Sequence, residues 1–148
     1  MSHAVIGRSI PRIDALDKVT GKALYPGDRS YEGQLWMKVL FARRPHARIL
    51  AIDTSAAMAL PGVVAVLTAR DVPVNEYGLQ IPDQPVLCGP GSGKAGAEIV
   101  RFVGDQVALV VAETETIAAR ARDLIAVEYE DLPLVDSPAY AMSGAAPQ

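Results

Sequence analysis

The sequence contains a single cysteine, Cys88, among its 148 residues. One thiol can form no internal disulfide, and it cannot by itself build a cysteine-ligated zinc or iron–sulfur site. We expect Cys88 to be a small, partly buried apolar residue rather than a reactive thiol. Neither His3 nor His46 has a Cys, His or Asp at a spacing typical of metal ligands, so His46 is expected to be structural, with its ring bonded to a backbone carbonyl.

Long apolar runs and an excess of basic residues are also missing. No stretch approaches the roughly 20 apolar residues that span a membrane, and Met1 to Val5 has neither the basic flank nor the apolar run of a secretory signal. The formal net charge is −3, and Lys and Arg are spread along the chain instead of forming the basic stripe that a phosphate backbone requires. We therefore expect a cytoplasmic protein that binds neither a membrane nor nucleic acid.

Motifs for nucleotide binding and catalysis are missing as well. The run GPGSGK from Gly89 to Lys94 differs from a phosphate-binding loop, because one residue too few precedes the Gly-Lys pair and Ala95 replaces the required hydroxyl. Glu128 and Glu130 would point to the same face of a strand, which suits a solvated edge better than an acid–base pair. No serine lies in a nucleophile elbow. The residues alone thus predict a domain without an active site.

What the sequence does contain is enough apolar residues, 50%, for one compact core. Two helices are predicted, from Ser55 to Leu60 and from Glu115 to Ile125, with Thr54 and Thr114 as their N-caps. Apolar and alternating runs predict the strands, which are residues 34–42, 46–53, 63–68, 99–103, 106–112 and 126–130. The result is a mixed α/β domain with about five or six strands and two main helices.

Two expectations about these strands are specific enough to check. The strand 34–42 is nearly all apolar, so we expect it to be buried on most of its surface. The segments 99–103 and 106–112 flank Gly104-Asp105, which predicts a tight hairpin between them.

The predicted core, 34–135, has less regular segments around and within it. Residues 1–33 mix charges with Gly and Pro and are expected to form an extended arm with turns at Thr20-Gly21 and Pro26-Gly27. A long loop, 71–98, is rich in Pro and Gly, and we expect a partner to order it. Residues 136–148 are expected to be a linker or tail, because they are poor in large apolar residues.

Three segments carry a resemblance to a known family. GRSIPRIDALDKVTGKALYPGD, residues 7–28, resembles the entry motif of molybdenum hydroxylase large subunits of the xanthine dehydrogenase and aldehyde oxidase type. The residues that match in register are Asp14, Lys18, Val19, Thr20, Gly21, Ala23, Tyr25 and Asp28. Residues 43–73 and 100–135 resemble the next two segments of the same family. The resemblance covers about nine-tenths of the chain.

The resemblance implies an α/β hammerhead fold and a structural role. Family members hydroxylate aldehydes or N-heterocycles, or oxidise carbon monoxide, with a molybdopterin cofactor that larger, following domains hold. Iron–sulfur clusters and FAD belong to partner subunits. This chain alone would therefore bind no cofactor and be inactive, and it would assemble with the rest of the molybdopterin-binding subunit. The interface residues that we expect in the arm are Lys18, Thr20, Gly21, Lys22, Tyr25 and Asp28.

A second hypothesis assigns the chain to another class of protein. The chain could be a free-standing scaffold or regulatory protein of the same fold, with no redox partner. A small independent enzyme has no constellation of residues in its favour. An adjoining reading frame that encodes the molybdopterin domains would favour the split subunit.

Overall fold

A computed structural model describes residues 6–147, so the expectations about Met1 to Val5 and His3 lie outside the described part. The chain divides into two compact units, residues 1–34 and residues 35–148. Among the described residues, no helix has both the length and the apolar character needed to cross a membrane.

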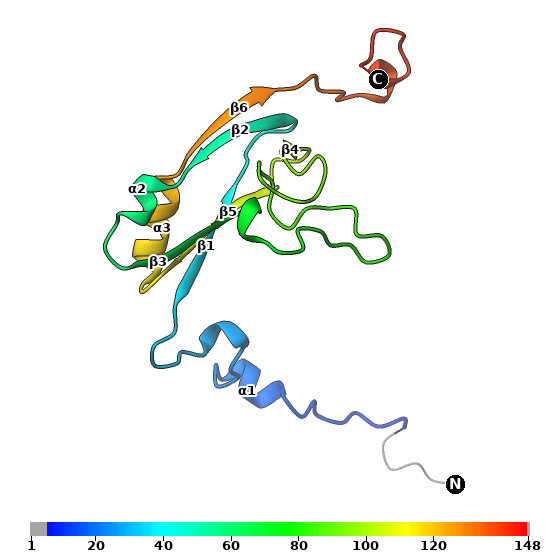
Figure 1. Cartoon of the computed structure of the whole chain (residues 1–148). Coiled ribbons are helices and arrows are strands. Elements are labelled where there is room, and N and C mark those ends of the chain that lie inside the picture. The colour runs from blue at the N-terminus through cyan, green and yellow to red at the C-terminus, as the bar shows by residue number, and fades with distance from the viewer. Residues whose placement is uncertain (1–5, 148) are drawn as a thin grey trace. The chain divides into compact units, whose positions relative to one another are not determined.

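The second unit contains two antiparallel sheets of three strands (Figure 1). The first sheet has the order β1-β5-β3, and its strands are β1 (Trp36–Phe41), β5 (Gln106–Ala112) and β3 (Val63–Thr68). The second has the order β4-β2-β6, and its strands are β4 (Ile99–Val100), β2 (Ala47–Asp53) and β6 (Ala126–Asp131). This mixed α/β architecture with six strands agrees with the predicted fold class.

Two helices close the core where the two sheets converge (Figure 1). They are α2 (Ser55–Met58) and α3 (Glu115–Asp123). Small side chains make this close approach possible, because Ala57 of α2 and Ala121 of α3 are fully buried against Ala108 and Val110 of β5. A second buried cluster lies between the sheets and includes Ile49, Cys88, Val100 and Val107.

The predicted hairpin of segments 99–103 and 106–112 is wrong. A turn does form, because Asp105 N donates to Phe102 O at 3.0 Å. The strands on its two sides, however, enter different sheets: β4 pairs with β2, whereas β5 pairs with β1 and β3. Local sequence showed the turn correctly, but the choice of pairing partner depends on distant segments.

Two further expectations need correction. The strand β1 is less buried than predicted: Trp36, Met37 and Phe41 are 39%, 56% and 45% exposed. The Thr54 hydroxyl does not cap α2; instead, the backbone N of Ser55 donates to Asp53 Oδ1 at 2.9 Å. The carboxylate one residue before Thr54 thus binds the first N–H of the helix, and the Thr54 side chain makes no capping bond.

The long loop 71–98 is tied to the core by its own residues. The buried Asn75 side chain accepts from Leu87 N at 2.9 Å and donates to Leu87 O at 2.8 Å. Next to it, Cys88 N donates to Gln106 O at 2.7 Å. The loop therefore supplies buried residues to this unit. Contacts within the chain already order part of it.

Short helices form at both ends of the chain where none were predicted. In the first unit, α1 (Ala15–Val19) and the 3-10 helix η1 (Pro26–Asp28) interrupt the arm. In the tail, α4 (Pro138–Ala141) begins at Ser137, whose hydroxyl accepts from Tyr140 N at 3.2 Å. A 3-10 turn, η2 (Ala69–Asp71), follows β3.

Candidate functional site

The predicted interface residues lie in the first unit, around the end of α1. Lys18 Nζ lies 2.7 Å from Asp14 Oδ2, one helical turn away. This bond is the largest cause of the lowered pKa of the Asp14 carboxyl, and Arg12 contributes in the same direction. The helix ends where Thr20 Oγ1 donates to Leu16 O at 2.7 Å and Gly21 adopts a positive φ of 72°. A left-handed residue directly after a helix is usually glycine, which has no Cβ to clash.

The remaining interface residues form a second turn. Lys22 N donates to Asp17 O at 2.8 Å, which returns the chain past the end of α1. Tyr25 N donates to Asp28 Oδ2 at 2.9 Å, and Asp28 N donates to Tyr25 O at 3.0 Å, so η1 is closed by a reciprocal pair of bonds. The structure thus places all six predicted residues in two adjacent turns fixed by local hydrogen bonds.

This first unit has no core of its own. No residue from 6 to 34 is buried. Large apolar side chains are widely exposed, among them Ile13 at 103%, Leu16 at 69% and Val19 at 82%. A backbone fixed by local bonds that presents charged and apolar side chains outward is suited to binding a surface.

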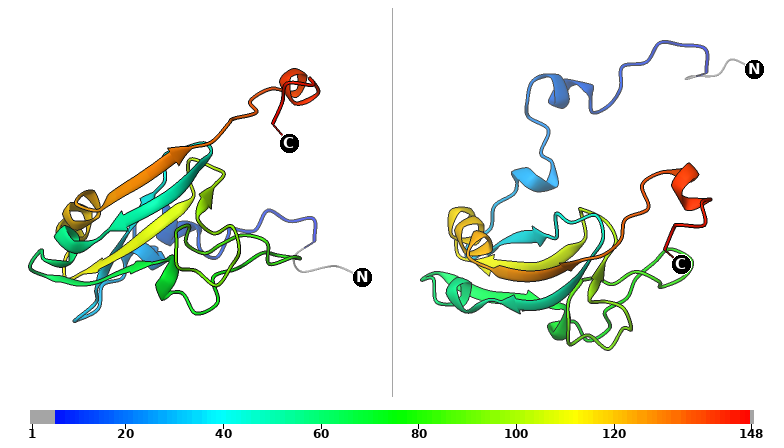
Figure 2. Two further views of the ribbon diagram at one scale, coloured as in Figure 1. Left: turned by 45° about the horizontal axis from the view of Figure 1, so that its top comes forward. Right: turned by 90° about the horizontal axis from the view of Figure 1, so that it is seen from above.

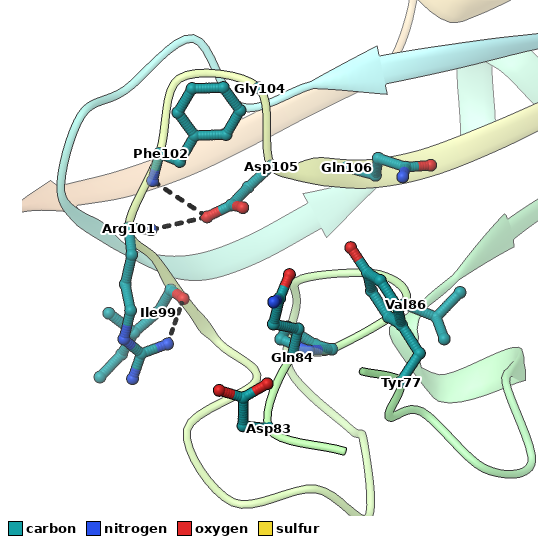
Figure 3. A pocket seen from close by; sticks show the side chains of 11 residues that line it. Tyr77, Asp83, Gln84, Val86, Ile99, Arg101, Phe102, Gly104, Asp105 and Gln106 are labelled. Atoms are coloured by element: carbon teal, nitrogen blue, oxygen red, sulfur yellow. Dashed lines mark hydrogen bonds between the residues drawn. The ribbon is translucent and has the colours of Figure 1, made fainter. Parts of the chain in front are cut away.

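The second unit holds a pocket that the sequence did not predict (Figure 3). Its volume is about 580 Å³. One wall is the part of the loop 71–98 where Tyr77 and Gln84 form an isolated antiparallel bridge, with backbone hydrogen bonds of 2.8 and 3.1 Å. The other wall is the 101–105 turn that precedes β5.

A carboxylate shapes that turn. Asp105 Oδ2 accepts from Arg101 N at 2.6 Å and from Phe102 N at 3.1 Å. The Arg101 guanidinium donates to Ile99 O at 3.1 Å (Figure 3). The carboxylate therefore fixes the turn itself, whereas the guanidinium binds the segment before it and also donates to Gly96 O at 3.4 Å. Phe102, 61% exposed, is the most exposed large apolar side chain of the pocket and offers a surface for apolar contact.

Cys88 and His46 have structural surroundings, and Lys94 forms an ion pair. Cys88 is 3% exposed, and burial, followed by the charge of Asp105, raises the pKa of its thiol to about 12. His46 Nδ1 lies 2.8 Å from Pro133 O, as expected of a ring bonded to a carbonyl. Lys94 Nζ lies 3.4 Å from Glu76 Oε2. Within residues 6–147, no three His, Cys, Asp or Glu side chains lie together as a metal site.

Glu128 and Glu130 are exposed neighbours on β6. Arg48 Nε lies 3.3 Å from Glu130 Oε2, across the pair that β2 and β6 form at this position. The solvated-edge interpretation of the two carboxylates is therefore confirmed.

Comparison with known proteins gives consistent matches. Residues 20–133 match the family model described as "Aldehyde oxidase and xanthine dehydrogenase, a/b hammerhead domain". The chain is 47% identical over 132 residues to a probable xanthine dehydrogenase subunit of Bacillus subtilis. It is 39% identical over 137 residues to the carbon monoxide dehydrogenase large chain of Afipia carboxidovorans. The matches cover 88% and 92% of this chain but only 17% and 16% of those proteins.

Solved structures agree with these sequence matches. The reconstituted CO dehydrogenase from Oligotropha carboxidovorans superposes with a TM-score of 0.82 and 37% identity over 95% of this chain. The aldehyde oxidoreductase from Desulfovibrio desulfuricans also gives a TM-score of 0.82, with 33% identity. This chain corresponds to 17% and 16% of those two chains.

Proposed function

Because the chain belongs to the aldehyde oxidase and xanthine dehydrogenase a/b hammerhead family, we propose that it is a structural and assembly module of a molybdenum hydroxylase large subunit. It spans only 17% and 16% of the two relatives compared above, so in this proposal the reaction belongs to a larger whole and the chain is inactive alone. The remaining part of the subunit holds the molybdopterin cofactor, and partner subunits carry the iron–sulfur clusters and FAD.

The observation that carries the assembly role is the first unit's lack of a core. Every described residue up to Gln34 is at least partly exposed, yet hydrogen bonds fix the turns at Gly21 and Asp28. A segment that cannot bury its own apolar side chains gains stability when another surface covers them. Lys18 and Asp28 add charges of opposite sign, which would orient the partner surface on the arm.

The test is a double variant of the arm, Lys18→Ala with Asp28→Ala. The bonds that these side chains make, from Lys18 to Asp14 and from Tyr25 N to Asp28, are local to a unit without buried residues. Exposed charges contribute only about 0–1 kcal/mol each to stability, so the melting temperature should change little. Removing one partner of a desolvated charge pair typically costs about 2–5 kcal/mol, so affinity for the cognate molybdopterin-binding region should fall sharply. Co-purification with a tagged form of that region, and titration calorimetry, measure this loss.

The matched control is Arg120→Ala with Glu128→Ala, which removes one exposed cation and one exposed anion from the second unit. This control should bind like the parent chain. Equal binding by both double variants would contradict the role of the arm. Failure of the parent chain itself to bind would contradict the assembly function and favour a free-standing scaffold.

A further inference from the structure

The two sheets of the second unit differ in the chemistry of their outer faces. In the β4-β2-β6 sheet, Ile49 and Tyr129 face each other across β2 and β6 and pack in the core. The neighbouring pair, Arg48 and Glu130, lies on the opposite face as an ion pair. This alternation of apolar and polar residues is typical of an antiparallel sheet with one face in water.

The β1-β5-β3 sheet lacks that alternation. Its inner face packs on the helices through Leu40, Ala108, Val110 and Val66. The pairing register places Met37, Val111 and Ala65 in one row of the outer face, and Val39, Leu109 and Leu67 in the next. Beyond these rows the register shifts, and Phe41 follows on β1 opposite Gln106. All seven side chains are apolar, and we call this set the outer sheet face.

The helices of the second unit do not cover this face. The buried residues of α2 and α3 belong to the cluster on the inner side. On the outer sheet face, Met37 is 56% exposed, Phe41 45% and Leu67 38%. The three strands lie side by side in one layer (Figure 2), and the pairing register places these residues next to one another on it.

A sheet that is apolar on both faces is normally covered on both faces. This explains why the sequence of β1 predicts a strand buried on most of its surface whereas Trp36–Phe41 is partly exposed here. The burial that the sequence encodes is thus incomplete in the chain alone. A second layer would complete it, and without charges on the outer sheet face that layer must itself be apolar.

We propose that the outer sheet face binds the molybdopterin-binding remainder of the large subunit. This inference rests on the proposed function, and it adds a second contact that is independent of the arm. The matched solved structures support this occupant: the same fold forms 17% of a much longer chain, so most of that polypeptide lies outside the domain and is available as cover. A second copy of this chain is the competing occupant.

The experiment uses two double variants with identical chemistry. Met37→Lys with Leu67→Lys places two charges on the outer sheet face. Met58→Lys with Leu50→Lys places the same charges on side chains that are 50% and 48% exposed, in α2 and in β2 of the other sheet. Affinity for the tagged molybdopterin-binding region is measured by calorimetry, and sedimentation gives the oligomeric state of each chain alone.

We expect the outer-face variant to keep its circular dichroism spectrum and melting temperature and to lose roughly 100-fold in affinity, because lysine cannot be desolvated cheaply. The control should bind like the parent chain. Equal binding by the two variants overturns this proposal while leaving the assembly function intact, whereas no binding by the parent chain refutes the assembly function. A parent chain that dimerises through the outer sheet face and binds the remainder unchanged overturns the proposal in favour of a second copy. If the lysines unfold the chain, Met37→Ser with Leu67→Ser, compared with Met58→Ser and Leu50→Ser, makes the same distinction.

Discussion

At the scale of single residues, Cys88 shows how a chain with one thiol keeps it inert. The side chain lies in the cluster of Ala42, Ile49 and Val107, and its exposure is 3%. Burial disfavours the thiolate, and the nearby Asp105 carboxylate disfavours it further, so the pKa of the thiol rises from 9.0 to about 12. Thiol reactivity requires the thiolate, so this cysteine is a packing residue.

We predict that Cys88 resists alkylation in the folded chain. At pH 8 the thiolate is scarce and covered, so the folded chain should react with iodoacetamide at least about 100-fold more slowly than the chain in guanidinium chloride. Mass spectrometry of timed samples measures both rates. Equal rates would show that the side chain is accessible and that its surroundings are described wrongly.

The same pKa shift has a consequence for stability. The folded thiol titrates near pH 12 and the unfolded thiol near 9.0, so the stabilisation is complete below pH 9 and declines as the pH rises toward 12. Burial also raises the pKa of Tyr129, which acts in the same direction. The alkaline side of the stability curve should therefore fall.

At the scale of elements, the two helix starts of the core form a natural comparison. Both α2 and α3 follow a threonine. Thr114 has extended backbone angles, and its hydroxyl accepts from Ile117 N at 3.2 Å. Thr54 has backbone angles of φ −102° and ψ 1° instead of the extended angles of a capping residue, and its hydroxyl makes no such bond; Asp53 accepts from Ser55 N.

We predict that Thr114→Ala lowers the free energy of unfolding by about 1 kcal/mol, the usual contribution of an N-cap hydrogen bond. Thr54→Ala is the control and should lower it much less. Urea titrations of the two variants measure both changes. A larger loss from Thr54→Ala would mean that the threonine hydroxyl, and not Asp53, stabilises the start of α2.

Sequence patterns predict some of these elements and miss others. Residues 63–68 and 106–112 became β3 and β5, because their apolar runs are short, β-branched and bounded by glycine or a turn. Pairing was not predictable from such patterns, so Ile99–Val100 joined β2 instead of β5. The helix α1 was missed, although Asp14 before it and Gly21 after it are start and stop signals.

The candidate site was predicted only where it depends on local sequence. The turns at Gly21 and Pro26–Asp28 could be read locally, and both are present. The pocket beside Tyr77 and Arg101 could not, because it combines two segments that only tertiary structure brings together. Its one local signal was Asp105, placed to accept bonds from the backbone of its own turn.

At the scale of the molecule, burial divides the chain into parts of different stability. In β5, residues such as Val107, Ala108 and Val110 are fully buried between two neighbouring strands. Up to Gln34, by contrast, no described residue is buried, and the hydrogen bonds are local. Segments with few buried contacts open at low free-energy cost.

We predict that amide hydrogens of residues 6–34 exchange within seconds in the isolated chain, while those of β5 exchange slowest. Within the loop 71–98, protection should concentrate at Leu87 and Cys88, whose backbone N–H groups donate to Asn75 and Gln106. Hydrogen exchange followed by mass spectrometry measures each segment. Slow exchange across residues 6–34 in the monomer would contradict an arm without a core of its own.

The strand order β1-β5-β3 also determines when this sheet can form as the polypeptide is synthesised. Neither β1 nor β3 pairs with the other, since both pair with β5. The ribosome must therefore add all the residues from Phe41 to Gln106 before β1 has a partner, a wait on the order of several seconds at usual elongation rates. During that interval the apolar strand Trp36–Phe41 is a target for chaperones on the nascent chain.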